Sequence, residues 1–291
     1  MNKFSYSRIN TYNQCPQKYK IQYIDKIYSS KNSLEAFMGK SVHDVLERLY
    51  SMKNLKNQFI SFDYLIEMYC EYWQKKWDND IIFARYKYNQ IKNDKSIVFN
   101  SNSIEKTYYN KIFNEGKKCL SNYYKKFNDS GYFKQNVLHV EYKFNIKIGK
   151  YTFIGFIDRI DQGKDGIIHI IDYKTSSKPH TQSKLKKDLQ LYIYEMAIRK
   201  SKEFQGLKGV DLSLFFLKSS IYLSCKHNKE ELSNLENKIL NNIELISKDK
   251  DFNGKESILC DWCFFWNQCD YKSIDNPSTN LNRNEFFNKN S

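Results

Sequence analysis

The sequence lacks any apolar run long enough to cross a membrane. Its longest apolar stretches, such as 213–217 and 167–171, fall far short of the roughly 20 residues that a transmembrane helix needs. Residues 1–5 show none of the apolar character of a secretory signal peptide. We therefore expect a cytoplasmic protein without a membrane partner. No internal repeat is evident, so repeat architectures are not indicated.

Basic and aromatic residues are abundant. The 291 residues carry a formal net charge of +14 and include 23 Tyr and 20 Phe. Lys and Arg bind phosphates, and aromatic rings stack on the bases of a single strand, so this composition suits a nucleic-acid partner. An AT-rich genome also enriches Lys, Asn, Ile and Tyr, and composition by itself leaves both explanations open.

Two acidic segments in the middle of the chain point to metal-dependent phosphodiester chemistry. They are Gly155-Phe156-Ile157-Asp158-Arg159 and Ile170-Ile171-Asp172-Tyr173-Lys174-Thr175. If 151–161 and 167–174 are strands, the period of two places Asp172 and Lys174 on one face. The carboxylates of Asp158 and Asp172 are ligands that Mg²⁺ or Mn²⁺ prefers. Lys174 could hold the attacking water or offset charge in the transition state.

Apolar periodicity predicts a mixed α/β protein of one domain, 1–291. Helices are expected in two pieces over 4–27, from Phe37 onward, and over 62–77, 104–124, 185–199 and 232–246. Strands are expected from Val137 onward and over 151–161, 167–174, 212–217 and 221–225, with two hairpin connections. A mainly helical insertion, about 48–134, precedes a catalytic core of about 135–225. The tail, 274–291, lacks periodicity and is expected to be flexible.

Two predicted helices carry polar residues one turn apart. His43 and Glu47 share a face of the helix that starts near Phe37, and Gly39 near its start permits close approach of a neighbouring backbone. Gln190 and Tyr194 share a face of the helix over 185–199.

The seven cysteines indicate a metal centre better than a disulfide framework, because the cytosol keeps thiols reduced. Cys260, Cys263 and Cys269 lie close together in sequence, and Cys15, beside Pro16, is the best candidate for a fourth ligand. The remaining three lie in apolar surroundings, where a buried thiol is usual. The spacing leaves an iron–sulfur cluster and zinc both open. Either would join the two ends of the chain.

Six motifs in this order resemble the RecB/AddB-type branch of the PD-(D/E)XK nucleases, over about 15–269. They are Cys15-Pro16, Gly39-Lys40-Ser41-Val42-His43, Gly155 to Arg159, Asp172 to Thr175, Gln190 to Tyr194, and the group Cys260, Cys263 and Cys269. The resemblance implies a restriction-endonuclease-like central mixed sheet flanked by helices, with a helical insertion and a C-terminal iron–sulfur staple closing onto Cys15.

The resemblance also implies roles for individual residues. The implied metal ligands are His43, Asp158, Asp172 and the backbone carbonyl of Tyr173. Lys174 is then the catalytic lysine, while Gln190 and Tyr194 position this lysine and the scissile strand. Glu141 would add negative charge or a water-mediated contact to the metal. The cysteines at 15, 260, 263 and 269 would hold a [4Fe-4S] cluster, with zinc as the alternative.

The expected enzyme is therefore a Mg²⁺- or Mn²⁺-dependent deoxyribonuclease. It would act as an exonuclease on single-stranded DNA or duplex ends in DNA repair or recombination. The chain lacks the Walker A pattern, so a helicase would have to be a separate subunit. Two alternatives are a CRISPR-adaptation-type nuclease, which more often carries Glu where this chain has Asp172, and a non-catalytic DNA-binding subunit of a helicase–nuclease complex.

Overall fold

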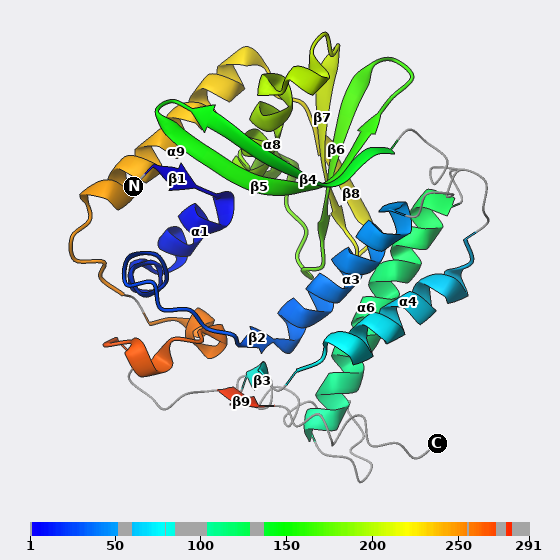
Figure 1. Ribbon diagram of the computed structural model, residues 1–291, viewed down its shortest axis with the longest axis vertical. Helices are drawn as coiled ribbons and strands as arrows, with labels where there is room; N and C mark the ends of the chain where they lie inside the picture. The colour runs from blue at the N-terminus through cyan, green and yellow to red at the C-terminus, as the bar shows by residue number, and fades with distance from the viewer. Residues whose placement is uncertain are drawn as a thin grey trace.

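The fold is a central mixed sheet between two groups of helices (Figure 1). The computed structural model describes residues 2–51, 60–78, 80–84, 104–128, 137–254, 256–271 and 278–280. The strands of the main sheet are β1 (Lys3–Phe4), β4 (Val137–Ile148), β5 (Tyr151–Gln162), β6 (Ile167–Lys174), β7 (Gly209–Phe216) and β8 (Ile221–Cys225). The bounds of β4 to β8 agree with the predicted strands to within a few residues, whereas β1 was not predicted.

β5 organises the sheet. It pairs with β4 in antiparallel register along one edge, and its other edge is shared by β1 and β6. β1 runs parallel to the start of β5, and β6 runs antiparallel to its end. β7 then pairs parallel with β6, and β8 antiparallel with β7. The mixed sheet and both predicted hairpins are thus present.

The helices occupy both faces of this sheet. They are α1 (Tyr6–Gln14), α2 (Pro16–Tyr19), the π-helix η1 (Lys20–Ile24), α3 (Leu34–Ser51), α4 (Phe62–Lys76), α6 (Ile104–Asn128), α7 (Gln182–Lys186), α8 (Leu189–Lys200) and α9 (Lys229–Lys248). Short 3₁₀ turns are η4 (Lys202–Phe204), η5 (Ile258–Trp262) and η6 (Trp266–Gln268). None of the helices in the described ranges combines the length and apolar character needed to cross a bilayer.

Two hydrophobic cores hold the layers together. One joins α1, α8 and α9 to one face of the sheet, and the other joins α3, α4 and α6 to the opposite face (Figure 1). Neighbouring residues of β6 therefore enter different cores: Ile170 belongs to the first and Ile171 to the second. Burial on both faces explains why this strand has a continuous apolar sequence rather than alternation.

Helix boundaries differ from the prediction at two places. α3 begins at Leu34, so Gly39 lies inside its second turn rather than at its start. The helix predicted over 185–199 is two helices, because Asp188 caps α8 by accepting hydrogen bonds from the N–H groups of Gln190 and Leu191. An Asp at this position satisfies N–H groups that a continuous helix would have bonded internally.

A small second sheet contains β2 (Asn32–Ser33), β3 (Ile81–Ala84) and β9 (Ser278–Asn280). β3 lies inside the insertion that was predicted to be mainly helical, and β9 lies in the tail that was predicted to be flexible. Both strands are too short to produce a recognisable period in the sequence. In the tail, 274–277 and 281–291 lie outside the described residues, as do 52–59, 85–103 and 129–134 of the insertion.

A buried ion pair connects β5 to the helices on one face. The Arg159 side chain is fully buried and donates to both oxygens of Asp161 at 2.7 and 2.8 Å. Its third nitrogen donates to the hydroxyls of Tyr50 on α3 and Tyr123 on α6. The guanidinium thus has partners on all sides, which a charge inside an apolar core requires.

Asp161→Ala should destabilise the fold strongly, because it leaves the buried Arg159 charge without its counterion. We expect the free energy of unfolding to fall by about 3–5 kcal/mol in urea titrations followed by circular dichroism. Asp251→Ala is the matched control, since Asp251 is exposed and should change stability by less than about 0.5 kcal/mol. Equal stability of the two variants would contradict a structural role for the pair.

Candidate active site

The candidate active site lies where β5 and β6 stop pairing. The last paired residues of this ladder are Arg159 and Ile171, and the next two, Asp158 and Asp172, do not continue it. Instead, Asp158 Oδ2 accepts a hydrogen bond of 2.7 Å from the backbone N–H of Tyr173. A side-chain oxygen therefore takes the place of a strand-to-strand hydrogen bond, and the two carboxylates lie at the opening between the strands.

Glu141 enters the site from β4 through an unusual backbone conformation. Its φ is 47°, in the left-handed region that non-glycine residues rarely adopt. The flanking residues Val140 and Tyr142 pair with Arg159 and Ile157, whereas Glu141 itself, opposite Asp158, is not paired. Such a local distortion changes the direction of a side chain, and backbone strain of this kind concentrates at functional sites.

His43, Glu141 and Asp158 form a group that could hold a metal ion. Each offers one ligand atom, and these three atoms lie within 4.8 Å of one another. His43 Nδ1 is 3.6 Å from Asp158 Oδ2, and α3 supplies this histidine from outside the sheet. Carboxylate oxygens suit Mg²⁺ and Mn²⁺, and an imidazole nitrogen is compatible with Mn²⁺. The donor set therefore fits the divalent cation that the acidic segments suggest.

A closed set of polar contacts lies beside this group. Asp172 Oδ2 is 2.5 Å from Lys174 Nζ, which donates to Gln190 Oε1 at 2.8 Å. The Gln190 amide then donates to Asp172 Oδ1 at 3.1 Å and to the Tyr194 hydroxyl at 2.7 Å. The lysine is thus held by one residue of its own strand and one of α8. This arrangement fixes the position of its ammonium group.

Neighbouring carboxylates and burial shift the pKa values of the ionisable groups in the site. Burial raises the pKa of Glu141 to about 7 and that of Asp172 to about 6, with the Asp158 charge adding to both. Burial acts to lower the pKa of His43, but Asp158 and its acidic neighbours outweigh it and raise the pKa to about 9. Burial likewise opposes a charged Lys174, yet Asp172 raises its pKa. The surplus of carboxylates favours binding of a cation.

The structure brings together every predicted residue of the catalytic site. It places Glu141 beside His43 and Asp158, while Asp172 contacts Lys174, and the expected role of Glu141, added negative charge or a water-mediated contact to the metal, stays a prediction. The contact observed for Tyr173 is through its N–H, and the role of its carbonyl stays a prediction.

Tyr6 is a neighbour of the site that sequence reasoning missed. Burial raises the pKa of its hydroxyl, Asp188 raises it further, and the charges of Lys174 and Asp172 also act on it. The first turn of α1 therefore lies near Lys174. Nothing in the sequence around Tyr6 signals this, because the proximity comes from packing of α1 against α8.

Gly39 allows α3 to approach the end of β6. A Cβ atom at this position would lie 2.8 Å from Thr175 Oγ1, directly after Lys174. The predicted close approach at Gly39 is therefore present, although the neighbour is a side chain rather than backbone. It places His43, one turn further along α3, beside Asp158.

The four cysteines predicted to act together line one pocket. Cys15 comes from the junction of α1 and α2, and the other three come from the segment around η5 and η6. Buried Phe265 and Trp266 line the same pocket. None of the four thiols is in a disulfide bond. Two segments far apart in sequence therefore contribute free thiols to the same pocket.

Hydrogen bonds and charges act on these sulfurs. Backbone N–H groups of Lys18 and Ser257 donate to Cys15 Sγ and Cys260 Sγ, each at 3.4 Å. Burial raises the pKa of the Cys263 thiol, and the neighbouring Cys260 adds to the rise. Because hydrogen bonds to sulfur tune metal–thiolate centres, the donor set is chemically suited to such a centre.

The protein belongs to the PD-(D/E)XK nuclease superfamily. The model of this superfamily matches residues 3–270, which include the whole main sheet and both candidate centres. The chain therefore contains a nuclease domain of this class, and its Asp158 and Asp172-x-Lys174 lie where β5 and β6 stop pairing.

Two solved structures are similar to the chain at low identity. One is described as a “Putative exonuclease” from Eubacterium rectale; it is 9% identical, with 89% of this chain and 86% of that chain covered and a TM-score of 0.47. The other, SSO0001, is 16% identical, with 64% and 94% covered and a TM-score of 0.31. Neither TM-score reaches 0.5, so neither likeness supports a conclusion about this chain. A comparison with curated proteins found no match.

Asp158→Asn should weaken binding of Mn²⁺, because it removes a charged oxygen from the group with His43 and Glu141. Isothermal titration calorimetry should show a loss of roughly tenfold or more in affinity. Asp165→Asn is the matched control, since Asp165 lies in the turn before β6, at the end opposite Lys174. Unchanged Mn²⁺ affinity in Asp158→Asn would contradict the assignment of this centre.

Proposed function

We propose that the protein is a Mg²⁺- or Mn²⁺-dependent deoxyribonuclease of the RecB/AddB-type branch. It acts as an exonuclease on single-stranded DNA or duplex ends in cytoplasmic DNA repair or recombination, beside a separate helicase subunit. The observation that carries the proposal is the convergence of two groups at the opening between β5 and β6. One group is the ligand set around Asp158, and the other is the polar set around Lys174.

The reaction is hydrolysis of a phosphodiester bond. A water oxygen bonds to phosphorus, the bond to the leaving sugar oxygen breaks, and the water proton goes to solvent while the leaving oxygen gains one. A divalent cation held by His43, Glu141 and Asp158, with Asp172 and the Tyr173 carbonyl as further ligands, would supply charge stabilisation and activation of water. The three grouped residues come from α3, β4 and β5.

Lys174 acts as a positive charge and a hydrogen-bond donor. Although burial opposes its charge, Asp172 keeps the pKa of Lys174 above its ordinary value, so the ammonium persists at neutral pH. A protonated lysine cannot accept a proton from water. It therefore orients the attacking water or offsets the negative charge that develops on the phosphate oxygens.

Gln190 and Tyr194 position the lysine. Gln190 accepts from Lys174 Nζ, donates to Asp172, and also donates to the Tyr194 hydroxyl. Asp188 caps the first turn of α8, and the contacts of Gln190 with Lys174 and Asp172 join that turn to β6. Loss of either positioning residue should misplace the ammonium without removing its charge.

Lys174→Ala should reduce cleavage of DNA by about 10²–10³-fold, because it removes a charge aimed at the developing phosphate oxyanion. The assay follows end-labelled single-stranded and blunt duplex DNA in Mg²⁺, which also separates exonuclease from endonuclease products. Exposed Lys208, which precedes β7 at the far end of the sheet, provides the control Lys208→Ala.

Wild-type cleavage by Lys174→Ala would contradict the proposed mechanism. If the native protein binds DNA but never cuts it with Mg²⁺ or Mn²⁺, the nuclease proposal fails and a non-catalytic DNA-binding subunit is supported instead.

We further propose that the pocket of four cysteines holds a [4Fe-4S] cluster. Four thiols, N–H donors to Cys15 and Cys260, and the buried rings of Phe265 and Trp266 in the lining are features that suit such a cluster. The cluster would link residue 15 to 260–269 across the domain, which restricts the unfolded chain and stabilises the fold.

Anaerobically purified protein should be brown and contain about four iron and four sulfide ions per chain. Cys263→Ser should lose both the colour and most of the iron, and it should lower the melting temperature. Cys70→Ala, on α4 and away from the pocket, should retain them. Colourless protein with one zinc ion per chain would replace the cluster with the zinc alternative.

A further inference from the structure

A basic groove runs along the face of the molecule formed by α1, α7 and α9. It consists of two adjoining pockets of about 510 and 630 Å³ that share Ser183, Lys187 and Lys238. Each is large enough for a nucleotide-sized group rather than a single ion. Because three residues line both pockets, the two adjoin and together extend from α9 past the α7–α8 connection to α1.

Three of the four lysines that line the groove lack acidic partners among the described residues. Lys184, Lys187 and Lys238 are exposed, and among the described residues none of the three forms an ion pair. The two acidic residues of the groove are already engaged: Asp188 caps α8, and Glu231 pairs with Lys186 at 3.0 Å. The groove therefore presents a net positive charge to solvent.

Amide side chains supplement these charges. Asn10 and Asn13 from α1 and Asn242 from α9 line the second pocket. A side-chain amide can donate hydrogen bonds to phosphate oxygens and can both donate to and accept from base edges, whereas an ammonium group only donates. A groove with both ammonium groups and side-chain amides suits an extended chain of phosphates that are separated by polar groups.

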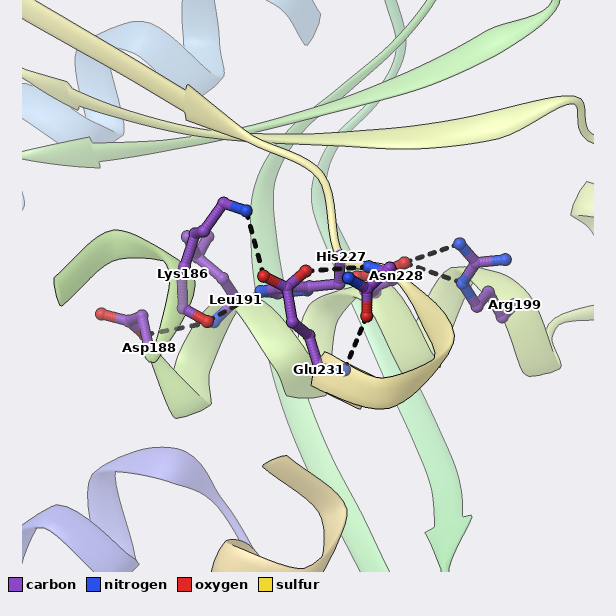
Figure 2. A network of polar contacts seen from close by, with 8 residues as sticks. Lys186, Asp188, Leu191, Arg199, His227, Asn228 and Glu231 are labelled. Carbon is purple, nitrogen blue, oxygen red and sulfur yellow. Dashed lines mark hydrogen bonds and ion pairs between the residues drawn. The ribbon is translucent and has the colours of Figure 1, made fainter. Parts of the chain in front are cut away.

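Buried polar contacts hold the walls of the groove in place (Figure 2). His227, directly before α9, contacts the Lys186 carbonyl at 3.1 Å and Glu195 at 2.7 Å. Arg199 donates to the other Glu195 oxygen, so the carboxylate is shared by two partners. The start of α9, the end of α7 and the middle of α8 are thereby tied together, and the groove is preformed.

The groove leads to the catalytic residues. Tyr6 on α1 and Asp188 at the start of α8 line the second of its two pockets. Asp188 caps the same turn of α8 that carries Gln190, and Gln190 accepts a hydrogen bond from Lys174. The charges of Asp188 and Lys174 both act on the Tyr6 hydroxyl, which agrees with this proximity.

We propose that the groove between α1, α7 and α9 binds the sugar–phosphate backbone of a single DNA strand and leads that strand to Lys174. This inference rests on the proposed nuclease function and assigns its substrate path. Lys184, Lys187 and Lys238 neutralise successive phosphates, while Tyr6 offers a ring near the reacting end. Pockets of nucleotide size suit one strand better than a duplex.

The test measures binding without cleavage. A fluorescein-labelled oligonucleotide of about 20 thymidines is titrated with protein in EDTA, and anisotropy is followed at several salt concentrations. Lys187→Gln/Lys238→Gln should weaken binding roughly tenfold near 0.1 M salt and make the slope of log K against log salt shallower by about 1.4, or about 0.7 for each lost phosphate contact.

The control variant carries the same charge change elsewhere. Lys164 and Lys208 are exposed and precede β6 and β7, at the end of the sheet opposite Lys174. Lys164→Gln/Lys208→Gln should keep wild-type affinity and slope. Circular dichroism melting curves should show that both double variants remain folded.

If the two double variants bind the oligonucleotide equally well, the groove is not its binding site. The proposal also fails if the native protein does not bind the oligonucleotide. An equally large loss on a blunt duplex of the same length would overturn the assignment to a single strand. If metal-dependent cleavage is absent but only the groove variant loses affinity, the nuclease proposal fails while the groove stands. If the groove variant keeps both wild-type affinity and wild-type cleavage, the groove proposal fails while the nuclease proposal stands.

Discussion

The hydrogen bond from the Tyr173 N–H to Asp158 is the interaction on which the site depends. It satisfies a backbone donor that the β5–β6 ladder leaves unpaired, so the strands can separate without an unsatisfied buried group. Separation at this point exposes Asp158 and Asp172 at one opening. A continued ladder would have placed the two acids opposite each other in an ordinary sheet.

The opening concentrates negative charge in a largely buried place, and the surrounding structure compensates for it. His43 and Lys174 provide positive charge from α3 and β6, and Gln190 restrains the lysine. The surplus of carboxylates makes the site receptive to a divalent cation. Further along β5, Arg159 and Asp161 neutralise each other, so the strand is anchored without adding net charge.

Most strands and helices could be predicted from the sequence, because their periodicity is local. β6 matches its predicted bounds, and β5 differs by one residue at its end. The break before α8 and the short strands β3 and β9 could not be predicted. The break depends on the capping geometry of Asp188, and the strands depend on partners far away in the chain.

The sequence by itself determined the chemistry available: carboxylates, a lysine and an imidazole in motifs of a known family, and cysteines at both ends. Tertiary structure decided which of them meet. It placed Glu141 beside His43 through a left-handed backbone conformation, brought Tyr6 near Lys174, and gathered along one groove three lysines that have no ion-pair partner among the described residues. Sequence spacing sets side-chain direction within one element, whereas convergence between elements depends on register and packing.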